Sequence, residues 1–367
     1  MRRFGMAVAV AIGLMSAHAE AAGPGAVFLM IFPDARTAAL GGCGTAMTDL
    51  DANTYYNPAG IAFGPRAAAT YTGVNWLPGL YPGMGYDHLG VAYRFGERLG
   101  VAANVIYLTT GTTDVVNERG EFLGRYRTWD AAPSITGAYR FPSWLSSGMT
   151  LKLIHSFLVP GWVWEEMPEL GIECGGQATT FAVDGGVQCR LFDLLSVGVA
   201  LNNLGPRLDY YRDDTIPGDR LPTILRLGYS LSPRIPGPVE VTLVADVWRD
   251  LVTPMWHSPY FVDTWEQMQD GIGLELRFAK LASVGLGYFE DIMGQRGGIV
   301  VEDSMGFTHH ISLLRHLDNP HLGRIVGWGF CWGVGVEYNG LKFDVGVDEN
   351  IYDFPTRNVR FQLSGRI

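Results

Sequence analysis

The chain has 367 residues, of which 47% are hydrophobic, 12% aromatic and only 17% charged, and 48 are glycine. Soluble domains carry about 25% charged residues and about 7% glycine, so this composition is unusual for one. The net charge of −10 argues against a nucleic-acid-binding surface, and the length allows either two soluble domains or one large barrel.

The N-terminus predicts a secretory signal peptide at residues 1–19, with cleavage as late as residue 22 as the alternative. Arg2 and Arg3 precede an apolar core at 6–15, and Ala17-His18-Ala19 has the small-x-small form of a cleavage site. The core is too short to span a bilayer as a helix, and no later apolar run is long enough. An exported chain of this kind belongs in the outer membrane or the periplasm.

Residues 23–65 lack the alternation of a strand. The segment after Pro33 can form a short helix that ends at Gly41-Gly42, and Asn57-Pro58 predicts a turn or a helix start.

From residue 67 onward, apolar and polar or small residues alternate, as they do in strands with one apolar face. The stretch from Gly327 to Asp348 is the clearest: two alternating arms flank Asn339-Gly340, the strongest short signal of a β-hairpin. Fourteen strands are expected, at 67–76, 86–95, 99–111, 130–141, 149–159, 178–190, 194–204, 222–231, 239–249, 270–279, 282–290, 325–338, 341–349 and 358–367.

The connections between these strands alternate in length, which separates a membrane barrel from a soluble sandwich. Seven are long, including 112–129 and 291–324, and six are short, including 96–98 and 339–340. Long loops outside and short turns in the periplasm are typical of outer-membrane barrels. The predicted fold class is therefore all-β: a 14-stranded antiparallel transmembrane β-barrel at 67–367, located in the bacterial outer membrane and in contact with its lipid.

Four cysteines are dispersed along the chain, and free thiols are the favoured interpretation. A bridge between Cys43 and Cys331 is conceivable only if the N-terminal segment packs inside the barrel, whereas Cys174 and Cys189 would lie too far apart.

The stretch from Phe28 to Ala46, which contains Pro33-Asp-Ala-Arg36, together with Tyr56-Asn-Pro-Ala59, resembles the start of the PorV/PorQ family. These are FadL-like outer-membrane barrels, and PorV is a component of type IX secretion. Asn-Pro-Ala is also shared with fatty-acid transporters of the FadL type. The C-terminal Ile367 is a mild departure, since many such barrels end in an aromatic residue.

The resemblance implies that residues 23–65 form a plug in the barrel mouth. A barrel of fourteen strands is too wide for its own side chains to fill, so its lumen is a channel unless something occupies it. Asp34, Arg36, Asn57 and Pro58 are the expected plug and lumen residues. Asp34 and Arg36 would contact charged residues of the lumen, or would be ordinary helix-end charges.

The long loops are rich in aromatic residues, which exposed loops seldom keep without a partner. They are candidates for binding a partner protein or a hydrophobic ligand, or for packing on one another or on the lipid interface. The residues concerned are Trp162, Trp164, Trp256, Tyr260, Phe261 and Trp265.

No catalytic set, metal site or cofactor site is expected. His309, His310, His316 and His321 fall in one loop, but their spacing fits no standard metal site. The main functional hypothesis is a non-enzymatic component of type IX secretion that binds cargo or the translocon through its loops. The alternative is a FadL-like transporter of hydrophobic small molecules, which a continuous apolar path from the loops to a gap in the wall would favour. A third hypothesis is a structural barrel or an enzyme such as a lipase.

Overall fold

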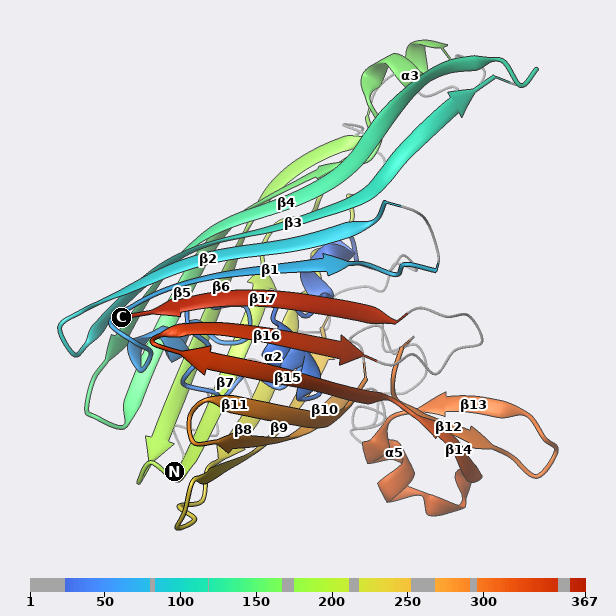
Figure 1. Cartoon of the computed structure of the whole chain (residues 1–367). Helices are drawn as coiled ribbons and strands as arrows, with labels where there is room; N and C mark the ends of the chain where they lie inside the picture. Colours follow the sequence, from blue (N-terminus) through green and yellow to red (C-terminus); the bar gives the residue numbers. More distant parts are fainter. Residues whose placement is uncertain are drawn as a thin grey trace, which may run out of the picture.

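A computed structural model describes residues 24–79, 83–117, 119–166, 175–210, 218–251, 268–290, 296–348 and 357–367, so the predicted signal peptide lies outside the described residues. Fourteen described strands close into one antiparallel barrel, in which β1 pairs with β17 and β11 pairs with β15 (Figure 1). They are β1 Ala67–Asn75, β2 Gly85–Phe95, β3 Leu99–Val116, β4 Phe122–Arg140, β5 Leu145–Phe157, β6 Gln177–Leu191, β7 Leu195–Leu204, β8 Ile224–Leu231, β9 Val239–Asp250, β10 Gln269–Phe278, β11 Ala282–Phe289, β15 Phe330–Tyr338, β16 Leu341–Asp348 and β17 Asn358–Arg366.

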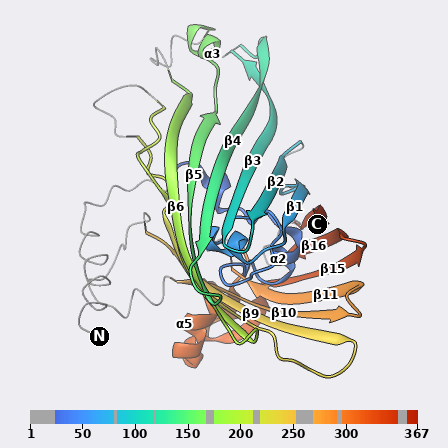
Figure 2. The same ribbon diagram turned by 90° about the vertical axis from the view of Figure 1, so that its left-hand side faces the viewer.

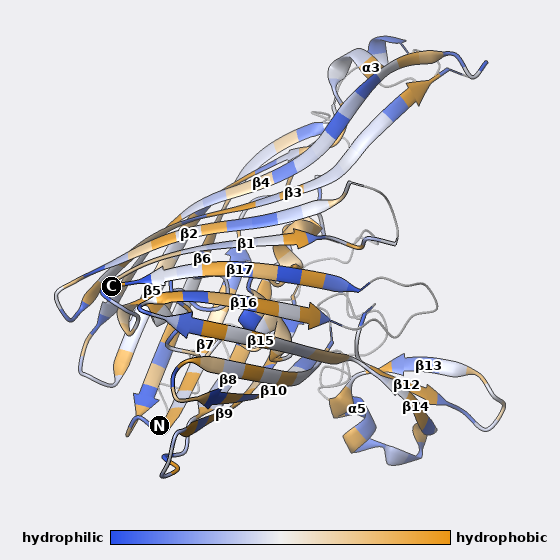
Figure 3. Cartoon of the chain, in the orientation of Figure 1, coloured by the Kyte–Doolittle hydropathy of each residue, from blue (hydrophilic) through white to orange (hydrophobic). Residues whose placement is uncertain are grey.

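The two faces of these strands differ as the alternation predicts. Large apolar side chains such as Leu89, Leu151 and Phe361 are exposed on the outside, while His88, Lys152 and Arg360 are buried on the inside. Apolar and polar residues accordingly alternate along several of the strands in Figure 3. An apolar outer band on a closed barrel needs hydrocarbon around it. The predicted barrel and its outer-membrane location are confirmed.

The loop predicted at 112–129 is wrong, because strands β3 and β4 continue through most of it. They pair from Leu99 with Tyr139 as far as Val116 with Phe122, with a bulge beside Gly111. The two strands therefore rise well beyond their neighbours, and the helix α3, Gly161–Glu166, lies beside their far end (Figure 1). Both faces of this extension are partly polar, which is why alternation did not reveal it.

The single strand predicted at 325–338 is also wrong, because it divides at Gly329. Its first part, β14 (Arg324–Trp328), pairs with β12 (Ile299–Glu302), which also pairs with β13 (Thr308–Ile311). This three-stranded sheet is separate from the barrel sheet. The helix α5 (Leu313–Asp318) and the 3-10 helix η4 (Pro320–Leu322) connect β13 to β14. Most of the loop predicted at 291–324 is thus a small folded unit, named here the side sheet (residues 299–328).

Cys43, Cys189 and Cys331 are free thiols, and Cys174 lies outside the described residues. None of the described helices is long and apolar enough to cross a membrane.

Candidate functional site: the occupied lumen

Residues 24–66 run through the inside of the barrel, where Figures 1 and 2 show them surrounded by strands. They contain η1 (Val27–Met30), α2 (Ala35–Ala39) and η2 (Pro58–Ala62). Helix α2 lies against β15 and β16, and η2 lies against β4, β5 and β6 on the other side of the lumen. The segment is named here the lumen segment.

Helix α2 is fixed by the two charged residues singled out in the sequence. Asp34 is its N-cap, and its carboxylate accepts a hydrogen bond of 2.8 Å from the Thr37 amide. Arg36 points at the wall, where its Nε and Nη2 donate to the two carboxylate oxygens of Glu275 at 2.7 Å each. Both side chains of this bidentate pair are buried. The sequence could not identify Glu275, which lies on β10.

Asp49 extends this ion pair into a small network. Its carboxylate lies 3.0 Å from Arg36 and 3.4 Å from Arg277. Burial alone would raise the pKa of Asp49, but the positive charges of Arg36 and Arg277, followed by those of Arg366 and Lys342, outweigh it and hold the pKa well below its ordinary value.

This network predicts acid sensitivity of the lumen segment. Because the folded-state pKa of Asp49 is lowered, its contribution to stability is complete above its unfolded pKa of about 4 and is lost as the pH falls below that value. Protease cleavage of the lumen segment should therefore increase as the pH is lowered from about 5 to about 3. Asp49→Asn should show a flatter pH profile under the same conditions; equal profiles would contradict the prediction.

The middle of the lumen segment is held through its backbone. The Asp246 carboxylate accepts hydrogen bonds from the amides of Gly44 and Thr45, at 2.8 and 2.9 Å. Asn57 caps η2 by accepting from the Ala59 amide, and its amide donates to the Thr45 carbonyl at 2.9 Å. Pro58 occupies the first turn of η2, where no amide hydrogen is needed. The two sequence motifs are thus joined inside the barrel.

Glycines on the lumen face of the strands let this backbone approach the wall. On Gly346 a Cβ would collide with the carbonyl oxygen of Ala35, and on Gly198 with that of Thr45. A strand glycine without a side chain is the residue that permits such an approach. Part of the high glycine content therefore serves the packing of the lumen segment.

Gly346→Val should loosen the lumen segment, because the new side chain occupies the space of the Ala35 carbonyl. Overpacking of this kind costs about 1–3 kcal/mol of unfolding free energy. Urea titration and protease cleavage of the segment would measure the effect. The matched control is Gly185→Val, since a Cβ there meets nothing within 4 Å. Equal losses in both variants would show that the strand, and not the segment, is affected.

The part of the lumen towards the long loops holds a large apolar cluster, beside the buried ion pairs of Asp348 with Arg296 and Arg360. One buried cluster joins Phe28 and Leu29 of η1 to side chains of at least seven strands and of the loops. Phe32 packs edge-on against Trp248 with ring centroids 5.6 Å apart. At the end of the segment, the Gly25 amide donates to the carbonyl of Arg220 in the loop after β7. The apolar interior thus reaches the extracellular loops.

Arg226 lies where the apolar and polar parts of the lumen meet. It is fully buried, and its guanidinium carbon lies 5.0 Å from the ring centroid of Tyr55, 5.4 Å from Tyr56 and 5.7 Å from Trp248. Cation–π contacts of this kind are strongest where water is excluded. They tie the lumen segment to β8 and β9.

The hydrogen-bond ladder between β4 and β5 is interrupted beside the apolar cluster, although the two strands keep one register and the inward-facing Ala132 and Ile154 are buried. Strands β4 and β5 pair on both sides of Ala132 and Pro133, but not at these two residues, which lie opposite Ile154 and Leu153. Pro133 has no amide hydrogen for the ladder. On the outside, an open apolar depression of about 460 Å³ surrounds the break, lined by Val105, Pro133, Ile135, Leu151, Leu153 and Phe181 among others.

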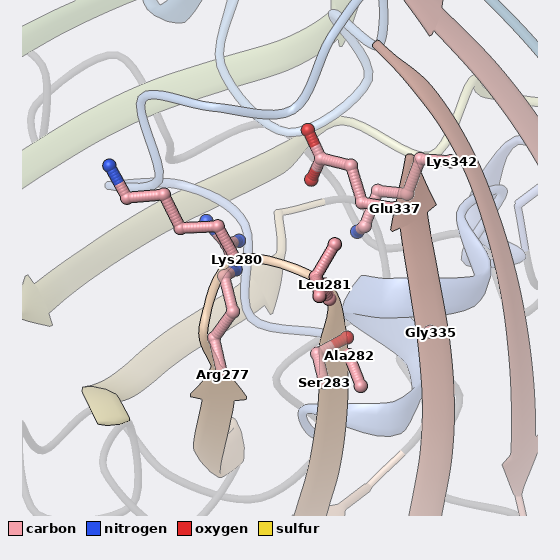
Figure 4. A pocket seen from close by; sticks show the side chains of 8 residues that line it. All are labelled: Arg277, Lys280, Leu281, Ala282, Ser283, Gly335, Glu337 and Lys342. Atoms are coloured by element: carbon pink, nitrogen blue, oxygen red, sulfur yellow. The ribbon is translucent and has the colours of Figure 1, made fainter. Parts of the chain in front are cut away.

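The periplasmic end of the lumen is charged and closely packed. Figure 4 shows Arg277, Lys280, Glu337 and Lys342 around a hollow between β10, β11, β15 and β16 that is too narrow for a water molecule. Lys342 pairs with Asp344 at 2.9 Å. The apolar path seen towards the loops does not continue here.

Comparison with known proteins gives structural matches only. No protein-family model and no curated protein sequence matches this chain. The crystal structure of the Ralstonia pickettii toluene transporter TbuX is similar over 91% of this chain and 98% of that chain, with a TM-score of 0.52 and 12% identity. The P. putida toluene transporter TodX gives the same coverage and identity with a TM-score of 0.50. At this identity the likeness shows the fold alone.

Two of the aromatic loop residues predicted as a partner or ligand site lie in α3. Trp162 packs edge-on against Tyr126 of β4, with ring centroids 6.4 Å apart, and the Trp164 indole donates to the Gly175 carbonyl at 3.2 Å. Both are half-buried by their own loop and by the β3–β4 extension. The other four, Trp256, Tyr260, Phe261 and Trp265, lie outside the described residues.

Proposed function

We propose that this protein passes small hydrophobic molecules across the outer membrane, the FadL-like function given above as the alternative. The observation that carries the proposal is the position of the interrupted ladder between β4 and β5. Ala132 and Ile154, the inward-facing residues at the break, belong to the same buried apolar cluster as Phe28 and Leu29. A hydrophobic molecule that enters at the loops could therefore reach the membrane without crossing the charged periplasmic end.

The lumen segment acts in this proposal as the plug. It occupies the apolar space that a ligand would need, so a ligand must displace η1 or the side chains around it. The hydrogen bonds of Arg36 and Asn57, and those from Gly44 and Thr45 to Asp246, lie on the other part of the segment. The part near η1 is held by fewer hydrogen bonds, which Tyr86 donates to the Ile31 carbonyl and Arg360 to the Phe32 carbonyl. In this proposal the part near η1 moves while α2 stays in place, which breaks these two bonds and the one from the Gly25 amide to the Arg220 carbonyl. The toluene transport named for TbuX and TodX, which share the fold, agrees with this substrate class.

Uptake of radiolabelled toluene tests the proposal. The full chain would be expressed in a bacterial host without such a transporter, with heat-modifiable migration on gels as the check of barrel folding. Faster toluene uptake, with unchanged uptake of glycerol as a polar solute, is the expected result. Unchanged toluene uptake by a folded barrel would overturn it.

Type IX secretion is a second candidate, which rests on the Pro33-Asp-Ala-Arg36 block and its resemblance to PorV/PorQ. In the structure Asp34 caps a helix and Arg36 binds the barrel wall, roles that suit either function. Cross-linking in intact cells distinguishes the two: recovery of a secreted cargo or of the secretion translocon supports the second candidate. If neither a cargo protein nor the translocon is recovered, the result favours the transporter function.

A further inference from the structure

The side sheet (residues 299–328) has a small core of its own and is joined firmly to the barrel. Ile299, Val301 and Ile311 are buried together against Tyr288 of β11. The Tyr288 hydroxyl accepts a hydrogen bond of 3.2 Å from the Leu313 amide at the start of α5. The position of the side sheet beside the barrel is therefore fixed by packing as well as by the chain.

Much of the outer surface of the side sheet is apolar. Met305 and Phe307, in the turn between β12 and β13, are 76% and 62% exposed, and Trp328 at the end of β14 is 62% exposed. Leu317, Ile325 and Val326 are also exposed. An apolar surface of this extent on so small a unit marks an interaction site.

This surface continues the lipid-facing band of the barrel. Val326 and Trp328 of β14 are exposed, as are Val334 and Val336 on the outer face of the next strand, β15. The rings of Trp328 and Phe330 stack with centroids 6.3 Å apart and an interplanar angle of 27°, across the point where the chain leaves the barrel. In Figure 2, α5 lies outside the ring of strands, beyond β9 and β10, so the unit overhangs the wall.

We infer that the side sheet rests on the outer leaflet of the membrane, with Phe307, Met305 and Trp328 inserted at the lipid interface. A tryptophan is typical of that depth, where its ring is apolar and its N–H is hydrated. Residues 299–328 carry two arginines and three acidic residues, so charge does not favour an anionic surface. The attachment is that of an interfacial unit held by apolar burial, and it does not depend on the proposed transport function.

Nitroxide labels at two equally exposed phenylalanines test the inference. Phe307→Cys and Phe122→Cys would be made in a Cys174→Ser, Cys189→Ser background, because Cys43 and Cys331 are buried. Phe122 is also 62% exposed, but it lies near the far end of the β3–β4 extension (Figure 1). The labelled full chain would be placed in vesicles of outer-membrane lipid, and collisions with oxygen and with a water-soluble nickel chelate would be compared.

The ratio of oxygen to chelate accessibility should be severalfold higher at residue 307 than at residue 122. The difference should persist in high salt, because charge does not hold the unit to the lipid. Equal, water-like accessibility at both positions would overturn the inference and would leave this surface to a protein partner. If either cysteine variant fails to fold, the quenching of tryptophan fluorescence by brominated lipid replaces the label experiment. It would be compared between the unaltered protein and Trp328→Phe. The substitution should reduce the quenching, and no reduction would count against insertion.

Discussion

Replacing Arg36 by alanine should both destabilise the protein and free the lumen segment. The change leaves the Glu275 carboxylate buried without its bidentate partner, and removing one partner of a buried pair costs about 3–5 kcal/mol. We expect the lower end of that range, because Arg277 remains 3.6 Å from Glu275. Urea titration would measure the loss, and single-channel recording would detect the expected rise in ion conductance as the segment loosens.

Two further variants distinguish the effect of the buried Arg36–Glu275 pair from the effect of removing any charged residue. Arg36→Leu combined with Glu275→Leu should lose less stability than Arg36→Ala alone, because no buried charge is left without a partner. Arg125→Ala removes an ion pair with Asp114 on the exposed β3–β4 extension and should change neither stability nor conductance noticeably. A conductance rise in Arg125→Ala equal to that in Arg36→Ala would contradict the explanation.

The barrel was predictable because lipid outside and a polar lumen inside impose alternation on nearly every strand. Alternation no longer predicts the strands correctly where that environment ends. Beyond Gly111, β3 and β4 extend past their neighbours, and polar residues such as Thr112, Asp114 and Arg125 make the segment resemble a loop. At Gly329 the alternation continues without a break, although the pairing changes from the barrel to the side sheet. Alternation indicates which face of a strand is apolar, but it does not indicate with which strand that strand pairs.

The lumen contacts show a similar limit. Asp34, Arg36, Asn57 and Pro58 could be singled out from a short motif, but their partners could not. Glu275 lies 239 residues from Arg36 in the chain, and it meets Arg36 only because strand order, stagger and the depth of α2 together place both at one level. Alternation assigns Arg226 to the lumen, but not the aromatic rings around it. A pattern in one strand carries no information about height in the barrel.

Pro133→Val should slow the uptake of toluene severalfold, because it restores the interrupted ladder between β4 and β5. Valine supplies the amide hydrogen that proline lacks, so β4 can pair with β5 through Ala132 and residue 133. One added ladder hydrogen bond is worth about 0.5–1.5 kcal/mol, so the variant should be slightly more stable than the parent. Radiolabelled toluene uptake and urea titration would be measured on the same preparations.

The control is Pro142→Val in the periplasmic turn after β4, where the Pro142 carbonyl accepts from the Leu145 amide and any residue can supply that oxygen. Slower uptake with raised stability in Pro133→Val alone indicates that the break is the exit, since a damaged barrel would lose stability as well. Unchanged uptake in a stabilised Pro133→Val would place the exit elsewhere in the wall, while leaving the apolar interior as the binding region. The stability measurement therefore distinguishes a variant with a restored ladder from a variant with a damaged barrel.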